Sequence, residues 1–328
     1  MVQAAERKII HAGEREYELV PNWGQLPEGW KWGQCAGIAT DSQDNVHVYT
    51  RTEHPYMVFD KNGKFLDSWG ENDFGMAHSL FITPKDDVYV LSHKDHWIRK
   101  FDKDRKPLME LGQKGVHSDT GYTKEGRFPA SPWLSGNGMP TTNAVQKSAG
   151  PFYEPTSIVQ HPDNGFIFIT DGYNNARVHK FSAEGQLLKS WGEPGNAVEN
   201  RNTKKNPGTF HTPHGVATFG DRVFVNDREG NRIQVFDLDG NFIEIWTMME
   251  RPTDLFIDKN GTVFFTELED HVSIRDLQGN EIGRFGSERS HEPGKFWGPH
   301  TIWVDSEENL YIGEVLEGQR VQKFARRK

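Results

Sequence analysis

Three histidines in this sequence are spaced so that they could bind one metal ion together. They are His78 in the segment AHSL, His214 in PHGV and His300 in PHTI. Imidazole nitrogens bind zinc and related transition metals, and three protein ligands with an open fourth position are typical of a catalytic metal site. A single histidine more often hydrogen-bonds a neighbouring carbonyl. The metal interpretation therefore depends on whether the fold brings the three together.

A repeat of about 40 residues runs through the chain and predicts the fold. Its clearest copies, 154–193 and 212–246, each contain four short strands separated by Gly turns, with Asp ending the second strand and Trp near the end of the fourth. Four antiparallel strands per repeat are typical of a β-propeller blade. The same pattern predicts six blades, at 35–71, 74–113, 153–193, 210–247, 250–287 and 296–324.

The last copy lacks its outer strand, and the N-terminus offers a replacement. Residues 17–24 (YELVPNWG) resemble the outer strands that end in Trp69-Gly70 and Trp191-Gly192. Supplying this strand from the N-terminus would leave no exposed sheet edge at the point of closure. We therefore predict an all-β, six-bladed propeller of the NHL-repeat kind, a single domain over residues 1–328 whose last blade is closed by the N-terminal strand.

Histidine recurs in every second blade at one position of the repeat. The start of the innermost strand carries Ala36, His78, Thr156, His214, Thr253 and His300. Alternate blades of a six-fold ring lie about 120° apart, so the three imidazoles can meet near the axis. Three histidines at one repeat phase favour a metal site, whereas His11, His93, His96, His117, His161 and His291 are expected at the surface.

The second strands end in a chemically mixed set of residues. These are Arg51, Ser92, Asp171, Asp227, Glu267 and Glu314, and the loops that follow include Tyr173 and Arg228. Asp171 and Asp227 are expected to hold the next loop, as carboxylates commonly do at turns. Arg51 has no such role and is a candidate for the site.

Two connections between blades are long, 115–150 and 195–208. The inserted loop 116–150 contains Tyr122, Phe128 and Trp133, and could fold over the active face as a lid that excludes water. The alternative is a loop without fixed structure.

Composition excludes several classes of partner. The 328 residues carry a formal net charge of −9 and no basic run beyond the C-terminal ARRK, so nucleic acid is not an expected partner. No long apolar run suggests a membrane span. Cys35 is the only cysteine, and the N-terminus lacks a signal-like stretch, so we expect a cytoplasmic protein without intrachain disulfides, monomeric or weakly oligomeric.

With these residues located, the chain resembles the peptidyl-α-hydroxyglycine α-amidating lyases over nearly its whole length. The resemblance is carried by the segments Pro155-Thr156, Asp171-Gly172-Tyr173, Asp227-Arg228-Glu229 and Arg232-Ile233-Gln234. It implies zinc bound by His78, His214 and His300, with Tyr173, Arg51 and Arg228 as catalytic residues.

The resemblance also implies a structural calcium ion. In that family calcium is held by two main-chain carbonyls, which would fall at Ile38 and Leu80, and by an aspartate after the third histidine. Thr301 stands in that place here. A calcium site would therefore have a hydroxyl where the family has a carboxylate.

The implied reaction cleaves the C–N bond of an N-acyl α-hydroxyglycine-like carbinolamide, giving an amide and glyoxylate without consuming water. Its substrate would be a small molecule or short peptide with a carboxylate. Zinc would act as a Lewis acid. Tyr173 would take the hydroxyl proton, for which a phenol needs neighbouring positive charge near neutral pH. Arg51 and Arg228 would supply it, and one of them could grip the substrate carboxylate.

Two alternatives stay open at this stage. The same metal could activate water to hydrolyse a lactone or ester. The propeller could also be a non-catalytic binding scaffold, since fold alone does not fix function.

Overall fold

The computed structural model describes residues 8–123 and 145–328. The chain divides into two compact units, unit 1 (Met1–Glu71 and Leu255–Lys328) and unit 2 (Asn72–Asp254). Strands dominate both, and the described residues include one short helix, α1 (Ala197–Asn200). No helix within the described ranges has the length and apolar character that crossing a membrane requires.

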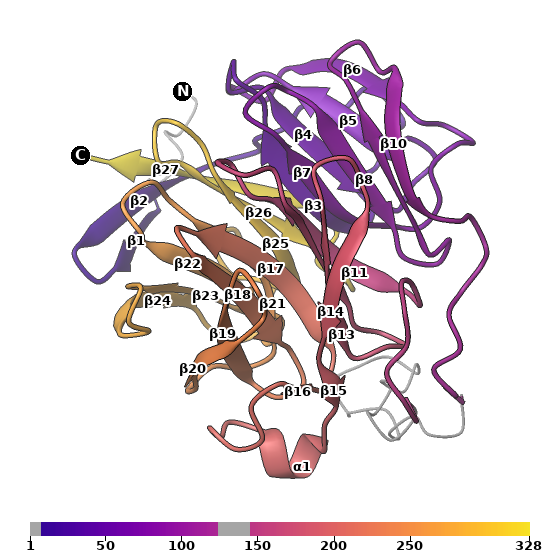
Figure 1. Ribbon diagram of the computed structural model, residues 1–328. Coiled ribbons are helices and arrows are strands. Elements are labelled where there is room, and N and C mark those ends of the chain that lie inside the picture. The colour runs from indigo at the N-terminus through magenta and orange to yellow at the C-terminus, as the bar shows by residue number, and fades with distance from the viewer. Residues whose placement is uncertain (1–7, 124–144) are drawn as a thin grey trace, which may run out of the picture. The chain divides into compact units, whose positions relative to one another are not determined.

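Unit 2 contains three antiparallel sheets of four strands each, in which neighbours in sequence pair with one another (Figure 1). The first comprises β7 (Ala77–Ile82), β8 (Val88–Ser92), β9 (Trp97–Phe101) and β10 (Pro107–Gly112). The second comprises β11 (Pro155–Gln160), β12 (Ile167–Asp171), β13 (Arg177–Phe181) and β14 (Leu187–Trp191). The third comprises β17 (Pro213–Phe219), β18 (Arg222–Asp227), β19 (Arg232–Asp237) and β20 (Phe242–Trp246).

The connection from the second to the third sheet has its own small structure. Strands β15 (Glu193–Pro194) and β16 (Thr209–Phe210) pair in parallel, and α1 lies between them in the chain.

Unit 1 holds the remaining sheets. One comprises β3 (Cys35–Thr40), β4 (Val46–Thr50), β5 (Tyr56–Phe59) and β6 (Phe65–Trp69). Another comprises β21 (Pro252–Ile257), which begins at the unit boundary, β22 (Val263–Glu267), β23 (His271–Arg275) and β24 (Glu281–Gly286). The last has five strands in the order β1 (Ile9–Ala12), β2 (Arg15–Val20), β27 (Val321–Arg327), β26 (Leu310–Glu314) and β25 (Pro299–Val304).

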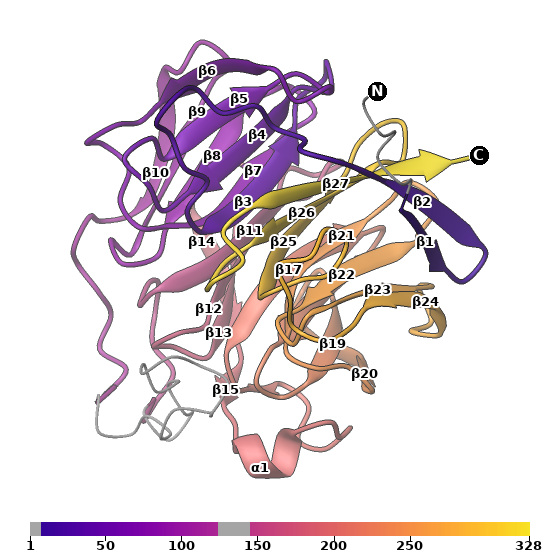
Figure 2. The same cartoon turned by 180° about the vertical axis from the view of Figure 1, so that it is seen from behind.

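The N-terminal segment closes the last blade, as the sequence predicts. Strand β2 pairs with β27 from Glu16 opposite Arg327 to Val20 opposite Lys323, and Figure 2 shows the two side by side. The prediction of an all-β, six-bladed propeller closed by this strand is confirmed. The structure adds β1, which pairs with β2 as a fifth strand and was not predicted.

Apolar faces pack between neighbouring sheets within each unit. In unit 2 the Trp191 ring at the end of β14 meets Phe236 of the following sheet at 5.8 Å, and Phe168 and Phe210 are fully buried beside them. Burying a side chain of this size contributes roughly 1.5–3 kcal/mol. The Trp that ends this outer strand is therefore part of the core between the two sheets.

Candidate metal centre and its surroundings

Each of the three histidines lies at a β-bulge near the start of an innermost strand. The ladder register shifts between Ala77 and Ser79 around His78, and the same shift occurs around His214 in β17 and His300 in β25. A bulged residue leaves the regular ladder, and its side chain can be aimed away from the sheet. The bulge therefore frees each imidazole to point where a regular strand would not send it.

One ring nitrogen of each histidine is fixed by a main-chain carbonyl. The acceptors occupy the same repeat position in a neighbouring blade, which for the last blade is the first blade of the chain. The pairs are His78 Nδ1 to Thr156 O at 2.6 Å, His214 Nδ1 to Thr253 O at 2.9 Å, and His300 Nδ1 to Ala36 O at 3.3 Å. A carbonyl can only accept, so Nδ1 carries the proton and donates. The lone pair of each neutral ring is then at Nε2, the nitrogen suited to bind a metal.

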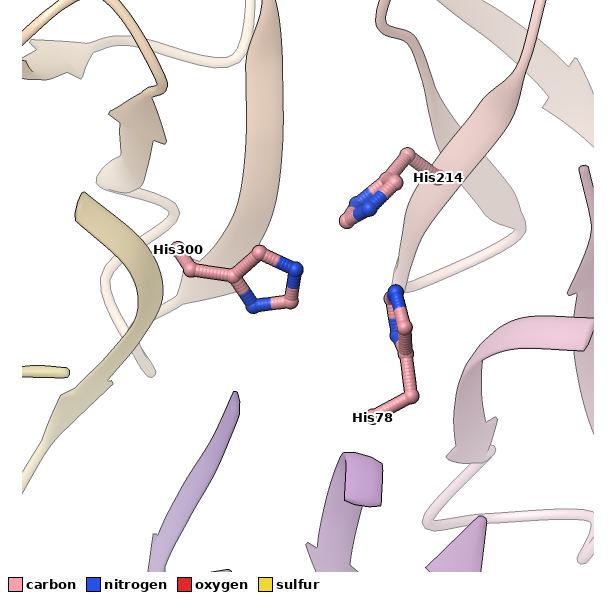
Figure 3. A group of neighbouring side chains, drawn as sticks. All are labelled: His78, His214 and His300. Atoms are coloured by element: carbon pink, nitrogen blue, oxygen red, sulfur yellow. The ribbon is translucent and has the colours of Figure 1, made fainter. Parts of the chain in front are cut away.

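The three imidazoles form one buried group. His78, His214 and His300 each offer a ligand nitrogen within 4.8 Å of the others, and Figure 3 shows the rings turned toward a common point. Each residue is less than 5 % exposed. Three imidazole nitrogens of fixed tautomer are a donor set that suits zinc and neighbouring transition metals. These residues therefore fit the metal that the sequence predicts.

Tyr173 lies directly against two of the histidines. Its hydroxyl oxygen is 2.8 Å from His78 Nε2 and 3.2 Å from His214 Nε2. The preceding Gly172 makes this approach possible, because a Cβ there would stand 1.8 Å from the carbonyl oxygen of Pro213. The Asp-Gly-Tyr loop after β12 thus places the phenol at the nitrogens expected to hold the metal.

Arg228 brings positive charge to the same phenol. The buried guanidinium donates from Nη1 to the Tyr173 hydroxyl at 3.3 Å, and its carbon lies 5.2 Å from the ring centroid. Burial alone would lower the pKa of Arg228, but attraction to Glu229 and Tyr173 outweighs it and raises that pKa. The site therefore contains a permanently charged donor beside its phenol.

Sequence reasoning missed His93, which follows the end of β8. Its ring centroid lies 5.0 Å from that of His78 and 5.4 Å from that of Tyr173, and the residue is buried. The prediction of a surface position is wrong for His93, and equally for His96 and His161, because these loops fold back onto neighbouring segments. The position of His93 in the repeat could have indicated its place in the site. It comes directly after the second strand of its blade, as Gly172, the residue before Tyr173, does in the next blade.

Arg51 lies in unit 1, directly after β4. Its Nη1 donates to Gln34 Oε1 at 2.6 Å, and its main-chain N–H donates to Gln34 O at 3.0 Å. Tyr173 belongs to unit 2, so a catalytic role for Arg51 beside Tyr173 stays a prediction.

The proposed calcium ligands do not include a carboxylate. The buried Thr301 hydroxyl accepts the main-chain N–H of Ile38 at 3.2 Å, and Leu80 is buried in unit 2. Calcium prefers several oxygen ligands with charged carboxylates among them. The calcium site at Ile38, Leu80 and Thr301 therefore stays a prediction, and the Thr301 hydroxyl gives it no support.

Asp171 and Asp227 hold loops, as the sequence predicts. Asp171 accepts the main-chain N–H of Tyr153 at 2.9 and 3.0 Å, and Asp227 accepts that of His211 at 2.6 Å. Arg232 donates to Asp227 of its own blade at 2.7 Å. These carboxylates are therefore structural.

The described ends of the inserted loop 116–150 contact the segment that carries Tyr173. Thr120 donates its hydroxyl proton to the carbonyl of Asn174 at 2.7 Å, and Asn175 contacts Ala149 through hydrogen bonds at 3.3 Å. The aromatic residues Phe128 and Trp133, on which the predicted lid depends, lie outside the described residues.

Comparison with known proteins gives a consistent relationship, although no family model matches the chain. The rat peptidylglycine α-amidating monooxygenase is 26% identical over 86% of this chain, which spans only 29% of that protein's length. A probable peptidyl-α-hydroxyglycine α-amidating lyase of Caenorhabditis elegans is 30% identical over 70% of this chain and 62% of its own length. A gluconolactonase from Xanthomonas campestris shares the fold, with a TM-score of 0.61 at 13% identity over 98% of this chain and 95% of the other.

The sequence matches to the amidating enzymes lead to one conclusion about ancestry. The chain is a homologue of the peptidylglycine-amidating enzymes, and of the peptidyl-α-hydroxyglycine α-amidating lyases among them.

Proposed function

We propose that this protein is a metal-dependent lyase that cleaves the C–N bond of an N-acyl α-hydroxyglycine-like carbinolamide to an amide and glyoxylate. The observation that carries the proposal is the Tyr173 hydroxyl, which lies between His78 Nε2 and His214 Nε2 and accepts a hydrogen bond from Arg228. The relationship to the amidating lyases supports the same reaction.

The metal would be held by Nε2 of His78, His214 and His300, and we propose zinc. Bound there, it would supply Lewis-acid stabilisation to oxygen atoms of the substrate. The protein's own part is to keep the three rings neutral and oriented through their Nδ1–H bonds to carbonyls.

Tyr173 would move the proton that the reaction must relocate. It accepts the proton of the substrate hydroxyl, the O–H electron pair becomes the second bond of the aldehyde carbonyl, and the C–N bond breaks. The same proton then passes to the departing amide nitrogen, so the atoms balance without water. Arg228 stabilises the phenolate that accepts the substrate proton and re-forms when that proton passes to nitrogen, because its guanidinium already donates to that oxygen.

The test is glyoxylate release from α-hydroxyhippurate by the metal-loaded protein. Tyr173→Phe should lower kcat on the order of 10²- to 10⁴-fold, the usual contribution of a general acid–base group, with metal content unchanged. Tyr17→Phe is the matched control, because Tyr17 is buried on β2 and should leave turnover intact.

Three results would contradict the proposal. Full activity in Tyr173→Phe would remove the phenol from the mechanism. Wild-type protein that hydrolyses lactones or esters but releases no glyoxylate would be a hydrolase, and protein with neither metal nor turnover would be a scaffold.

A further inference from the structure

Arg228 belongs to a buried cluster of three charges, and the proposed mechanism gives no role to the other two, Glu229 and Arg251. Arg228 donates from Nε to Glu229 Oε1 at 2.7 Å. Arg251 approaches the same carboxylate with two donors, Nε to Oε2 and Nη2 to Oε1, both at 3.1 Å. The side chain of Arg228 is 4 % exposed, that of Glu229 13 % and that of Arg251 7 %. One carboxylate thus joins two guanidinium groups in a nearly dry environment.

The backbone around the cluster is tied down on both sides. The main-chain N–H groups of Arg228 and Glu229 donate to the carbonyls of Thr212 and His211 at 3.0 Å, in the segment that leads into β17. The main-chain N–H of Arg251 donates to Asn231 Oδ1 at 3.1 Å. The carboxylate is therefore anchored independently of Tyr173.

Glu229 stays charged under any ordinary condition. Burial would raise the pKa of its carboxyl group, but Arg251 and Arg228 outweigh burial and hold that pKa at about 2. With Glu229 ionised, the two arginines and one glutamate carry one net positive charge next to the phenol. The carboxylate accepts from Arg228 Nε, so the guanidinium can rotate little about its bond to the side chain, and Nη1 is directed to the Tyr173 hydroxyl.

We infer that Glu229, itself held by Arg251, is a positioning residue that fixes the Arg228 guanidinium against the Tyr173 hydroxyl. This rests on the proposed function insofar as the phenol acts in turnover. The inference also assigns Arg228 to the proton step rather than to gripping the substrate carboxylate. Loss of the Arg228 guanidinium, or of the Glu229 carboxylate that positions it, should therefore lower kcat more than it raises KM.

The repeat supplies a matched control at the same position of the next blade. Glu269 follows β22 as Glu229 follows β18, and it pairs with Arg289 at 3.2 Å. Its neighbour is Leu268 where Glu229 has Arg228. Glu269→Gln therefore removes an ion pair at the same repeat position, with Glu269 26 % and Arg289 21 % exposed, that is not part of the Arg228–Glu229–Arg251 cluster.

The decisive experiment is a double-mutant cycle on glyoxylate release from α-hydroxyhippurate. Glu229→Gln puts an amide N–H₂ against guanidinium donors and should lower kcat on the order of 10²-fold, with KM changed less than threefold, because small misplacements of a catalytic group cost about that much. Glu269→Gln should leave kcat unchanged. In an Arg228→Gln background, Glu229→Gln should lower kcat less than threefold further, because the two act as a unit. Multiplying effects, or a loss confined to KM, would overturn the inference.

A second measurement does not depend on turnover. The ¹⁵N–¹H signal of Arg228 Nε, assigned by its absence in Arg228→Gln, should be protected from solvent exchange in the wild type and in Glu269→Gln, and broadened in Glu229→Gln. An unchanged signal in a folded Glu229→Gln protein would overturn the positioning role whatever the activity. Wild-type protein that releases no glyoxylate but shows the expected signals would instead count against the proposed function alone.

Discussion

Gly215, next to His214, offers a direct perturbation of the metal site from outside the ligand set. A Cβ at this position would stand 2.6 Å from the carbonyl oxygen of Thr253, the acceptor of His214 Nδ1. It would also lie 2.9 Å from Asn226 Nδ2 and 3.1 Å from the Asp254 Cα. Real Cβ contacts essentially never fall below 3.0 Å, so the new Cβ and the carbonyl oxygen must separate by at least about 0.4 Å in Gly215→Ala.

That separation acts on the hydrogen bond between the Thr253 carbonyl and His214 Nδ1, which fixes the ring of His214. If the carbonyl moves directly away, the Nδ1 to O distance of 2.9 Å lengthens toward the limit of a hydrogen bond. Losing such an outer contact typically lowers metal affinity about 10- to 100-fold, which corresponds to roughly 1.4–2.8 kcal/mol. Overpacking should also destabilise the fold by about 1–3 kcal/mol.

The assay is zinc affinity by competition with a chromophoric chelator, alongside thermal unfolding of the metal-free protein. Gly150→Ala is the control for the same chemical change, because a Cβ at Gly150 meets nothing within 4 Å. Zinc affinity within twofold of the wild type in a folded Gly215→Ala protein would refute the role given to the Thr253 carbonyl.

Three further outcomes are expected. Thr156→Val removes the hydroxyl that donates to the main-chain carbonyl of Pro213, the residue before the zinc ligand His214, at 2.8 Å. The variant should therefore weaken zinc binding about tenfold in equilibrium dialysis, and an unchanged zinc affinity would contradict this prediction. Arg232→Met leaves the buried Asp227 without its 2.7 Å partner and should cost about 3–5 kcal/mol of unfolding free energy in urea; a cost below about 1 kcal/mol would count against that pairing. Because the pKa of Glu229 is depressed from 4.5 to about 2, its stabilising contribution is complete above pH 4.5 and is lost as the pH falls through about 2. Wild-type protein should therefore lose more stability across that window than Glu229→Gln does, and equal losses in acid urea titrations would contradict it.

The repeat made much of this predictable from sequence. Apolar periodicity and Gly turns fix the blades, so His78, His214 and His300 could be recognised as one phase of the repeat before any contact was known. The closing strand was predictable for the same reason, because residues 17–24 match outer strands elsewhere. Its partner β1 was not, since an added edge strand has no counterpart in the other blades.

The features that tune the site depend on contacts that the repeat does not encode. A pattern cannot show that the carbonyl of Thr156 fixes the tautomer of His78, because that bond joins residues 78 positions apart. The polar residues around His93 favour a surface position, whereas tertiary packing buries its side chain. Arg251 reaches Glu229 from another connection, so only the folded chain reveals that one carboxylate serves two guanidinium groups.

The most direct test of the metal centre is the metal content of the purified protein, measured by elemental mass spectrometry. The same measurement is made on a triple variant that carries His78→Ala, His214→Ala and His300→Ala. The expected result is about one zinc ion per wild-type chain and none in the folded variant, since three fixed Nε2 atoms form the donor set. Equal metal in both proteins, or no metal in a wild-type protein supplied with zinc, would contradict it.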